Sequence, residues 1–295
     1  MLNRREIVVA GVALAGSALI GRRAHAAGGP ADSFAAELKK LEADSGGRLG
    51  VALLDTGSGA VIGQRLDERF AMCSTFKLLV VGAILARVDA GKEDPTRRIR
   101  VSSGDLVAYS PVTKMHIGGD GMMVKELCEA AVSQSDNAAA NLLVTSLGGP
   151  PQVTAFARSL GDLVTRLDRV EPDLNEGREG DVRDTTTPQA MALNLQALSL
   201  GNALSQASRD LLVAWLVGNK TGDTRIRAGL PTGWRVGDKT GSGSNGTTND
   251  VAVIWPQQRA PVIISVYLTQ AKVSADKQNA TIAAATRAAV VALGG

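Results

Sequence analysis

The order of apolar and polar positions predicts a helix followed by a β-hairpin at the start of the chain. Residues 31–43 place their apolar side chains at helical spacing. Residues 49–54 form a short apolar run typical of a buried strand, residues 55–59 are rich in turn formers, and residues 60–64 suit the returning strand.

The middle of the chain has a different pattern. From residue 74 to about residue 216, long alanine, leucine and valine runs at helical spacing are separated by loops of glycine, proline and aspartate. The polar stretch 171–188 is unusually long for a loop inside a compact domain, and such loops are usually functional or disordered. We expect a set of packed helices here.

Strand patterns return near the end of the chain. They cover residues 234–240, 250–255 and 262–269, and an alanine-rich helix follows at about 275–293. Strands at both ends with helices between them predict an α/β fold of the α+β type, in which both termini complete one sheet. We expect a five-stranded antiparallel sheet flanked by the N- and C-terminal helices, with an inserted all-helical lobe.

The expected domain organisation follows from this pattern. Residues 27–295 would form one domain, with an α/β lobe made of about 27–68 and 219–295 and a helical lobe at about 69–218. A small-molecule site is expected in the cleft between the lobes.

Residues 1–26 have the pattern of an export signal that is removed. A basic pair, Arg4-Arg5, precedes an uncharged apolar run at 7–20, and Ala24-His25-Ala26 fits the small-x-small cleavage rule. The run is too short for a membrane span. The sequence predicts a periplasmic or extracellular protein, exported by the general secretory or the twin-arginine route.

Charge gives no reason to expect a nucleic-acid or membrane partner. The predicted signal holds four arginines and one glutamate, so its net charge is +3. The whole chain also has a net charge of +3. The mature protein is therefore formally neutral, and we expect no nucleic acid, no membrane after signal cleavage, and a monomer.

A hydroxyl and an amine stand three residues apart at Ser74 and Lys77. If Ser74 opens a helix, this spacing places Lys77 on the same face, within reach of the hydroxyl. Only His25 and His116 exist, and His25 lies in the predicted signal, so a Ser/His/Asp triad and a histidine-rich zinc site are both disfavoured. A lysine or a carboxylate is the more plausible base for a serine nucleophile.

Two short patterns occur twice, and each copy needs its own interpretation. Ser274 is also followed by a lysine three residues later, but there the serine suits the N-cap of the final helix. Lys220-Thr221-Gly222 is typical of a helix C-terminus. Lys239-Thr240-Gly241 instead ends a predicted strand and can present polar groups to a cleft, so it is the functional candidate.

Three further segments carry polar chemistry. Ser135 and Asn137 could relay a proton and bind an amide, whereas Asp136 between them suits a helix cap. Glu171 lies in the long polar loop, where solvated charge is the ordinary interpretation. Residues 241–246 match the glycine pattern of dinucleotide-binding loops, but a strand and not a helix follows them, so we reject that function.

The two cysteines, Cys73 and Cys128, leave two alternatives. An exported protein can form a disulfide, but buried free thiols are the commoner outcome for such positions, and we favour free thiols.

Together, four boxes in this order resemble the class A serine β-lactamases. The resemblance covers essentially the whole mature chain, and the joint match is far more specific than any one box. The boxes are Ser74-x-x-Lys77, Ser135-Asp136-Asn137, Glu171-x-x-Leu174-Asn175 and Lys239-Thr240-Gly241.

The resemblance implies hydrolysis of penicillin- and cephalosporin-type antibiotics, and hence antibiotic resistance, without cofactor or metal. By similarity, Ser74 is the nucleophile, and Lys77 or a water held by Glu171 takes its proton. Glu171, with Asn175, would then activate the water that hydrolyses the acyl-enzyme. Ser135, assisted by Lys239, would protonate the departing ring nitrogen.

The resemblance also assigns the residues that hold the substrate and the loop. Backbone N–H groups of Ser74 and Ser242 would form the oxyanion hole. Asn137 would bind the substrate's amide side chain, and Tyr109 would line the entrance. The resemblance also implies an ion pair between Arg169 and Asp184, which would join the two ends of the long polar loop.

The chain departs from many relatives at the carboxylate site and at the cysteines. In many relatives an arginine binds the substrate carboxylate, and Thr248 occupies that position here. Other members supply the guanidinium from the position of Arg225, so Arg225, with Thr240 and Ser242, is the candidate group that binds the substrate carboxylate. The family's partner positions for the two cysteines are Gly243 and Val81, which supports the free thiols.

Two other serine acyl-transfer functions stay open. A penicillin-binding D-Ala-D-Ala peptidase would share the fold, the serine and the lysine, but would lack the hydrolytic base predicted at Glu171. A non-catalytic β-lactam sensor domain would hold the acyl group without releasing it, and would need an anchor or signalling region.

Overall fold

The computed structural model describes residues 29–294. The predicted export signal at residues 1–26 lies outside the described residues. Within residues 29–294, no helix is both long and apolar enough to span a membrane.

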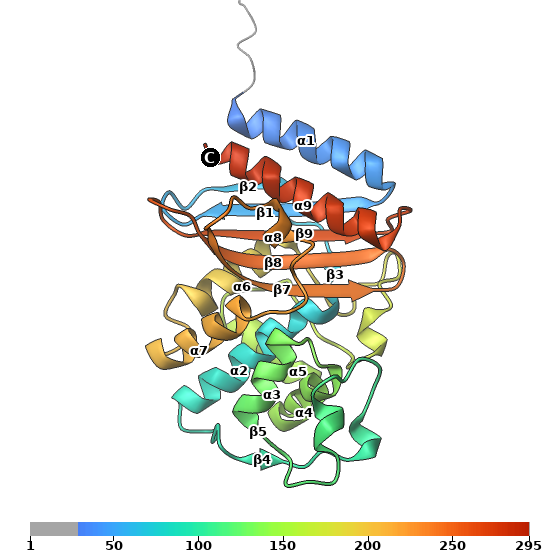
Figure 1. Ribbon diagram of the computed structural model, residues 1–295, viewed down its shortest axis with the longest axis vertical. Coiled ribbons are helices and arrows are strands. Elements are labelled where there is room, and N and C mark those ends of the chain that lie inside the picture. Colours follow the sequence, from blue (N-terminus) through green and yellow to red (C-terminus); the bar gives the residue numbers. More distant parts are fainter. Residues whose placement is uncertain (1–28, 295) are drawn as a thin grey trace, which may run out of the picture.

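A five-stranded antiparallel sheet divides the molecule, as predicted (Figure 1). The strands are β1 (Arg48–Asp55), β2 (Val61–Gln64), β7 (Arg235–Gly243), β8 (Thr247–Trp255) and β9 (Val262–Thr269). Their order is β2-β1-β9-β8-β7, so the first and last strands of the chain are neighbours. Leu49 of β1 lies opposite Leu268 of β9.

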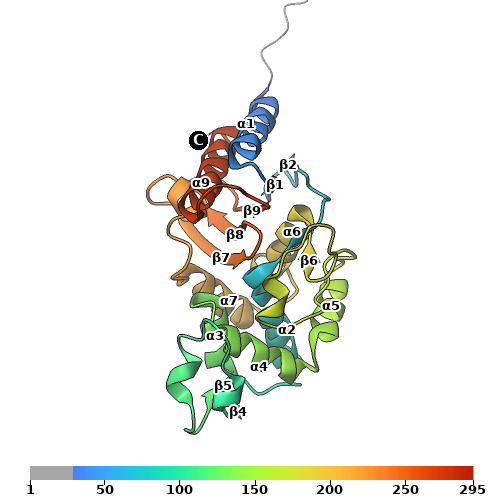
Figure 2. The ribbon, with the colours of Figure 1, turned by 90° about the vertical axis from the view of Figure 1, so that its right-hand side faces the viewer.

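One face of the sheet is covered by the two terminal helices, α1 (Pro30–Ser45) and α9 (Ala275–Ala292), which lie side by side (Figures 1 and 2). The side chains of β9 alternate between two cores because successive residues of a strand point to opposite faces. Ile264 packs with Phe34 and Ile282 under these helices, whereas Ile263 and Tyr267 pack toward the helical lobe.

Six helices form the inserted lobe on the other face of the sheet (Figure 2). They are α2 (Lys77–Asp89), α3 (Val124–Ser133), α4 (Asn137–Leu147), α5 (Pro150–Ser159), α6 (Pro188–Ser199) and α7 (Gln206–Val217). A one-turn helix, α8 (Ile226–Gly229), follows α7 and packs against α9.

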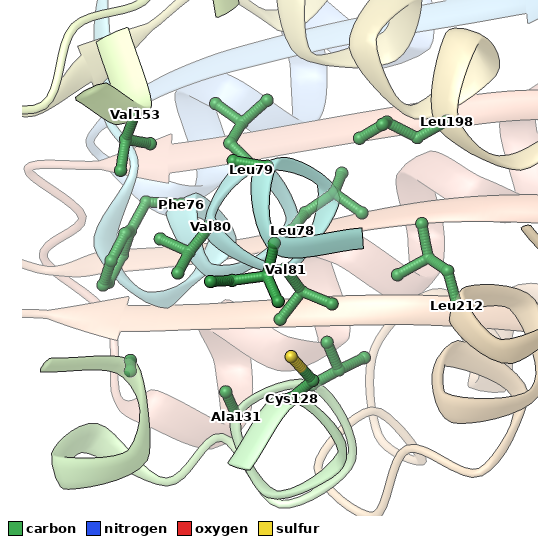
Figure 3. Packing of buried hydrophobic residues seen from close by; sticks show 14 of the residues in the cluster. Phe76, Leu78, Leu79, Val80, Val81, Cys128, Ala131, Val153, Leu198 and Leu212 are labelled. Carbon is green, nitrogen blue, oxygen red and sulfur yellow. The ribbon is translucent and has the colours of Figure 1, made fainter. Parts of the chain in front are cut away.

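Helix α2 lies inside the helical lobe and is apolar on all sides (Figure 3). Every residue from 77 to 85 is buried, which is typical of a core helix. Burial of a leucine such as Leu79 contributes about 1.5–3 kcal/mol. Gly82 brings neighbouring helices close, because a Cβ there would lie 2.9 Å from Leu198 Cδ2 and 3.1 Å from Phe156 Cε1.

Several short elements were not predicted from the sequence. β3 (Phe70–Ala71) pairs with β6 (Thr185–Thr186), and β4 (Arg98–Ile99) pairs with β5 (Met122–Met123). The short 3-10 helices are η1 (Cys73–Phe76), η2 (Ser103–Asp105), η3 (Thr113–His116) and η4 (Asp173–Asn175).

Two local predictions need correction. Ser74 lies in η1, and the α-helix begins only at Lys77, although a 3-10 turn also brings residues three apart onto one side. Helix α7 ends at Val217 with Gly218 as its C-cap, so Lys220-Thr221-Gly222 lies beyond the helix end. Two cap predictions are confirmed: Asp136 accepts a hydrogen bond from Ala139 N at 2.8 Å, and Ser274 occupies the N-cap of α9.

Both cysteines are buried free thiols, as favoured from the sequence. Burial raises the pKa of Cys73 and of Cys128 above the ordinary thiol value. Neither thiol therefore has the low pKa of a reactive cysteine.

Candidate active site

A pocket of about 310 Å³ collects the sequence candidates from distant parts of the chain. Helix η1, the turn before α4 and the edge strand β7 all contribute. Its lining residues are Ser74, Tyr109, Ser135, Asn137, Asn175, Thr221, Arg225, Thr240, Gly241 and Ser242.

The Lys77 amine lies at the base of this pocket beside the Ser74 hydroxyl. Lys77 Nζ is 2.9 Å from Ser74 Oγ, 2.8 Å from Ser135 O and 2.5 Å from Asn137 Oδ1. It is also 3.2 Å from Glu171 Oε1. These oxygens can all accept hydrogen bonds from a protonated Lys77, and after loss of one proton the amine, 2.9 Å from Ser74 Oγ, could accept the serine proton.

Burial acts on this lysine in the direction that general base chemistry needs. The Lys77 side chain is 0% exposed, and desolvation lowers its pKa from the ordinary lysine value, while the Glu171 carboxylate opposes that shift. The buried lysine therefore loses its proton more easily than a lysine in water.

Glu171 reaches the same hydroxyl from the loop of residues 169–184. Its Oε1 lies 3.2 Å from Ser74 Oγ, and its Oε2 accepts a hydrogen bond from Asn175 Nδ2. Asn141 of α4 makes two hydrogen bonds to the backbone of Glu171. Asn141 Nδ2 donates to Glu171 O, and Asn141 Oδ1 accepts from Glu171 N, each at 2.9 Å. The carboxylate is thus fixed between the Ser74 hydroxyl and the Asn175 amide.

The ends of this loop are joined as the sequence predicted. Arg169 Nε lies 2.6 Å from Asp184 Oδ2, and Arg169 Nη1 lies 2.8 Å from Glu176 Oε2. The fully buried Asp184 carboxylate also accepts hydrogen bonds from the backbone N–H groups of Asp168 and Arg169. Because a buried carboxylate needs such partners, Arg169 is central to the loop's conformation.

A second buried lysine approaches Ser135. Lys239 Nζ donates to Ser135 Oγ at 3.0 Å and to Thr240 O at 2.8 Å, and Lys77 Nζ is 3.4 Å from the same Ser135 hydroxyl. Burial, together with repulsion from Lys77, lowers the pKa of Lys239 well below the ordinary value. Ser135 therefore lies between two lysines that can exchange protons with it.

The strand β7 can approach Ser74 because Gly241 has no side chain. A Cβ at Gly241 would lie 2.9 Å from Met72 O and 3.2 Å from Ser74 N. The next residue, Ser242, lies at the pocket edge and is exposed. Bare backbone therefore lies where a substrate carbonyl would have to fit.

Arg225 presents an unneutralised cation beside Ser242. Its Nη2 donates to Ser242 Oγ at 2.7 Å, its Nη1 to the carbonyls of Gly241 and Asn249 at 2.9 and 2.8 Å, and its Nε to Asn279 Oδ1 at 2.9 Å. Among the described residues no carboxylate lies within 4.0 Å of it. Burial lowers its pKa somewhat, but a guanidinium stays charged, so an anionic substrate group can pair with it.

Tyr109 and Asn137 border the pocket opposite β7. Tyr109 is 59% exposed, and its backbone O accepts from Asn137 N at 3.0 Å. Asn137 Nδ2 donates to Ala108 O at 2.8 Å, which leaves its second amide hydrogen for a ligand. Tyr109, Ser135 and Cys73 have φ values of 61°, 57° and 45°, and such left-handed residues gather at functional sites.

Three contributors were missed by the sequence reasoning. Asn141 holds Glu171, Asn279 orients Arg225, and the Thr221 hydroxyl is hydrogen-bonded to that of Thr240, which the sequence had already indicated. Asn141 had a usable signal, since it follows Asn137 by four residues on the same helix face. Thr221 belongs to the Lys-Thr-Gly copy that we assigned to a helix end, and its place in the pocket corrects that interpretation.

Fold and site together fit a serine hydrolase, and comparison with known proteins gives the family. Residues 33–293 match the model of the β-lactamase enzyme family. The chain is 52% identical over 251 residues to β-lactamase CTX-M-8 of Citrobacter amalonaticus, covering 85% of this chain and 86% of that one. It is 51% identical over 257 residues to β-lactamase Toho-1 of Escherichia coli, covering 87% and 88%.

A solved structure agrees with these matches. An ancestral (GNCA) class A β-lactamase is 62% identical with a TM-score of 0.86, covering 88% of this chain and 99% of that chain. The chain therefore belongs to the class A β-lactamases, a family of serine hydrolases, as its motifs indicated.

Proposed function

We propose that this chain opens the β-lactam ring through an acyl-enzyme on Ser74 and then hydrolyses that acyl-enzyme. Family membership gives the reaction. One observation supports the assignment of Lys77 and Glu171 as the groups that accept protons in its two steps. Lys77 Nζ and Glu171 Oε1 both lie within 3.2 Å of Ser74 Oγ, so the hydroxyl has two proton acceptors within reach.

In the acylation step, Ser74 Oγ attacks the ring carbonyl and the carbon–nitrogen bond of the ring breaks. The serine proton passes to Lys77, or to Glu171 through a water. Ser135 donates a proton to the departing nitrogen and recovers one from its lysine neighbours, Lys77 and Lys239. Backbone N–H groups of Ser74 and Ser242 stabilise the oxyanion, and loss of one such donor typically costs about 3 kcal/mol.

In the deacylation step, Glu171 takes a proton from a water that then attacks the ester carbonyl. The Asn175 amide, hydrogen-bonded to the carboxylate, helps to hold that water. The ester bond breaks, Ser74 regains its proton, and the ring-opened acid leaves. This second step separates a hydrolase from a protein that is only acylated.

Substrate binding uses charge on one side of the pocket and an amide on the other. Arg225, with the hydroxyls of Thr240 and Ser242, pairs with the carboxylate of the antibiotic. The Asn137 amide binds the substrate's acyl side chain, and the Tyr109 ring borders the entrance. A guanidinium without a carboxylate partner supports this orientation.

The cellular setting of this function is also a proposal. The pattern of residues 1–26 supports removal of an export signal, leaving a mature domain at 27–295 with the α/β and helical lobes bounded near residues 68 and 219. The mature protein would act in the periplasm or outside the cell as a monomer, without cofactor or metal.

The variant Glu171→Gln tests the two-step assignment. We expect Ser74 to be acylated by a penicillin in this variant and the adduct to persist, because an amide cannot accept the water proton. Intact-protein mass spectrometry during a time course measures the adduct. The matched control is Glu129→Gln on the exposed side of α3, which should turn over like the unmodified enzyme.

The alternatives give different results in the same experiment. A stable adduct on the unmodified protein would favour the peptidase or the sensor domain. Fast release by Glu171→Gln would show that another group activates the water.

A further inference from the structure

A second pocket lies against the loop of residues 169–184 and shares no lining residue with the catalytic pocket. Its volume is about 360 Å³. The walls come from the segment before Ser74, the tip of the loop and the end of strand β9. We call it the arginine pocket, after five of its lining residues: Arg48, Arg69, Arg169, Arg178 and Arg183.

Cations outnumber anions in this pocket. Its lining contains three carboxylates: Glu68, Glu179 and Asp181. Two of these are already engaged, since Glu68 lies 2.6 Å from Arg48 Nη2 and Asp181 lies 2.7 Å from Arg183 Nη2. The lining itself has a net charge of +2, but Arg169 also pairs with Asp184 and Glu176, and Arg178 with Glu176, so most of its arginines already have a carboxylate partner.

Arg69 is the cation in this pocket without a carboxylate partner. Among the described residues its only hydrogen bonds run from Nη1, to Val164 O at 3.0 Å and to Thr185 Oγ1 at 2.9 Å. Its Nε and Nη2 have no acceptor and are not sealed from solvent. Two neighbouring N–H donors on one guanidinium match the spacing of two oxygens of a phosphate or carboxylate.

We propose that the arginine pocket binds a small multivalent oxyanion, such as a diphosphate, with Arg69 as the central contact. The volume accommodates an anion of that size, and Arg178 at the rim can turn toward it because its side chain is 68% exposed. Arg48, whose guanidinium carbon lies 4.6 Å from the centre of the Phe70 ring, also lines the pocket but is paired with Glu68. The proposal does not rest on the β-lactam chemistry.

The position of Arg69 connects such a ligand to the catalytic loop. Arg69 directly precedes strand β3, which leads into η1 and Ser74, while its partner Thr185 belongs to β6 at the end of the loop. An anion bound by both Arg69 and Arg178 would connect the segment before β3 with the tip of the loop of residues 169–184. We therefore expect binding to slow hydrogen exchange in the loop of residues 169–184.

Isothermal titration calorimetry with inorganic pyrophosphate at low salt tests the proposal. Arg69→Gln should weaken binding by at least about tenfold, because it removes two charge-assisted hydrogen bonds. The matched control is Arg235→Gln, which removes the same charge from an exposed arginine outside the pocket. Arg235→Gln should bind pyrophosphate with an affinity within about twofold of the unmodified protein.

Further variants exclude misfolding and binding elsewhere. Arg178→Gln removes an exposed rim cation whose only ion pair among residues 29–294 is with Glu176, so it should weaken binding by about threefold without disturbing the fold. Arg225→Gln removes the cation of the catalytic pocket and should leave the titration unchanged. An absence of binding, equal binding by Arg69→Gln, or a loss confined to Arg225→Gln would overturn the proposal.

Discussion

Helix α2 and the loop of residues 169–184 each place one ionisable side chain beside the Ser74 hydroxyl, but different forces hold them. Residues 77–85 of α2 are all buried and, apart from Lys77, carry no charge. The loop is held mainly by charge, through the pairs of Arg169 with Asp184 and Glu176. Lys77 therefore lies on a tightly packed core helix, and Glu171 on a segment held by ion pairs.

This difference separates the two half-reactions physically. In the proposed mechanism, acylation uses Ser74 and Lys77, which apolar packing positions. Deacylation in that mechanism needs Glu171, whose position depends on the ion pairs and on Asn141. Damage to the loop should therefore stop release of the product before it stops formation of the acyl-enzyme, whereas damage to the core should lower the amount of folded enzyme.

The largest effect is expected from Leu79→Ala in the core. Leu79 is fully buried in α2 (Figure 3), so removal of its side chain would leave a cavity. The free energy of unfolding should fall by about 2–5 kcal/mol, measured by urea denaturation. The ratio of the acylation to the deacylation rate constant should stay within about twofold.

Leu193→Ala is the matched control for the core variant. Leu193 lies on α6 and is 43% exposed, so the same truncation should change the free energy of unfolding by no more than about 0.5 kcal/mol. If Leu79→Ala instead slowed only deacylation, the proposed separation of the two regions would be wrong.

The next largest effect is expected from Arg169→Gln in the loop. This change leaves the buried Asp184 carboxylate without its cation and loosens the segment that carries Glu171. Deacylation should slow by about 10- to 100-fold, or about 1.4–2.7 kcal/mol, while acylation stays within about threefold. Single-turnover kinetics with mass-spectrometric detection resolves the two steps.

Arg183→Gln is its control on the same loop. The Arg183 side chain is 48% exposed and pairs with Asp181, so its loss should cost less than about 1 kcal/mol and leave deacylation nearly unchanged. Equal slowing by both variants would mean that net charge, not the pair with Asp184, holds the loop.

The smallest effect is a pH dependence that is expected in the loop and not in the apolar part of helix α2. A hydrogen bond from Arg183 lowers the pKa of Asp181 from 3.8 to about 2, and one from Arg166 lowers the pKa of Asp168. Because these folded-state pKa values are depressed, the stabilisation is complete above pH 3.8 and is lost as the pH falls toward 2. The loss in the loop's local opening free energy should be about 1 kcal/mol or less.

Hydrogen exchange measured at pH 4 and pH 2.5, corrected for intrinsic rates, tests this prediction. Protection should fall in residues 169–184 and persist in residues 78–85, which contain no titratable side chain. A uniform loss over both regions would show that acid unfolds the molecule as a whole.

The sequence predicted most of the long elements because their patterns are periodic. Strand β9 was placed at its observed bounds, and the two terminal helices within about two residues. The two-residue strands β3 and β6 were missed, because two residues cannot show a period and their pairing depends on the rest of the fold. The same limit explains η1, since a single 3-10 turn resembles the start of an α-helix.

The site was predictable where chemistry makes residues rare. A serine and lysine three apart, with a distant glutamate and asparagine, are unusual enough to identify from their order along the chain. Asn279 and Thr221 are not unusual, and they reach the pocket only because α9 and the segment after α7 fold back toward β7. Such contributors depend on tertiary packing, which local sequence does not encode.

The pairing of the first strand with the last sets the order in which the enzyme can be assembled. Strand β1 has the late strand β9 as its neighbour, and α1 packs on α9, so a growing chain cannot complete its sheet until nearly all of it has been synthesised. Ser74 emerges early, but Lys239 emerges more than 160 residues later. A ribosome-bound fragment thus carries a nucleophile without a catalytic pocket, and activity should begin only when synthesis is almost finished.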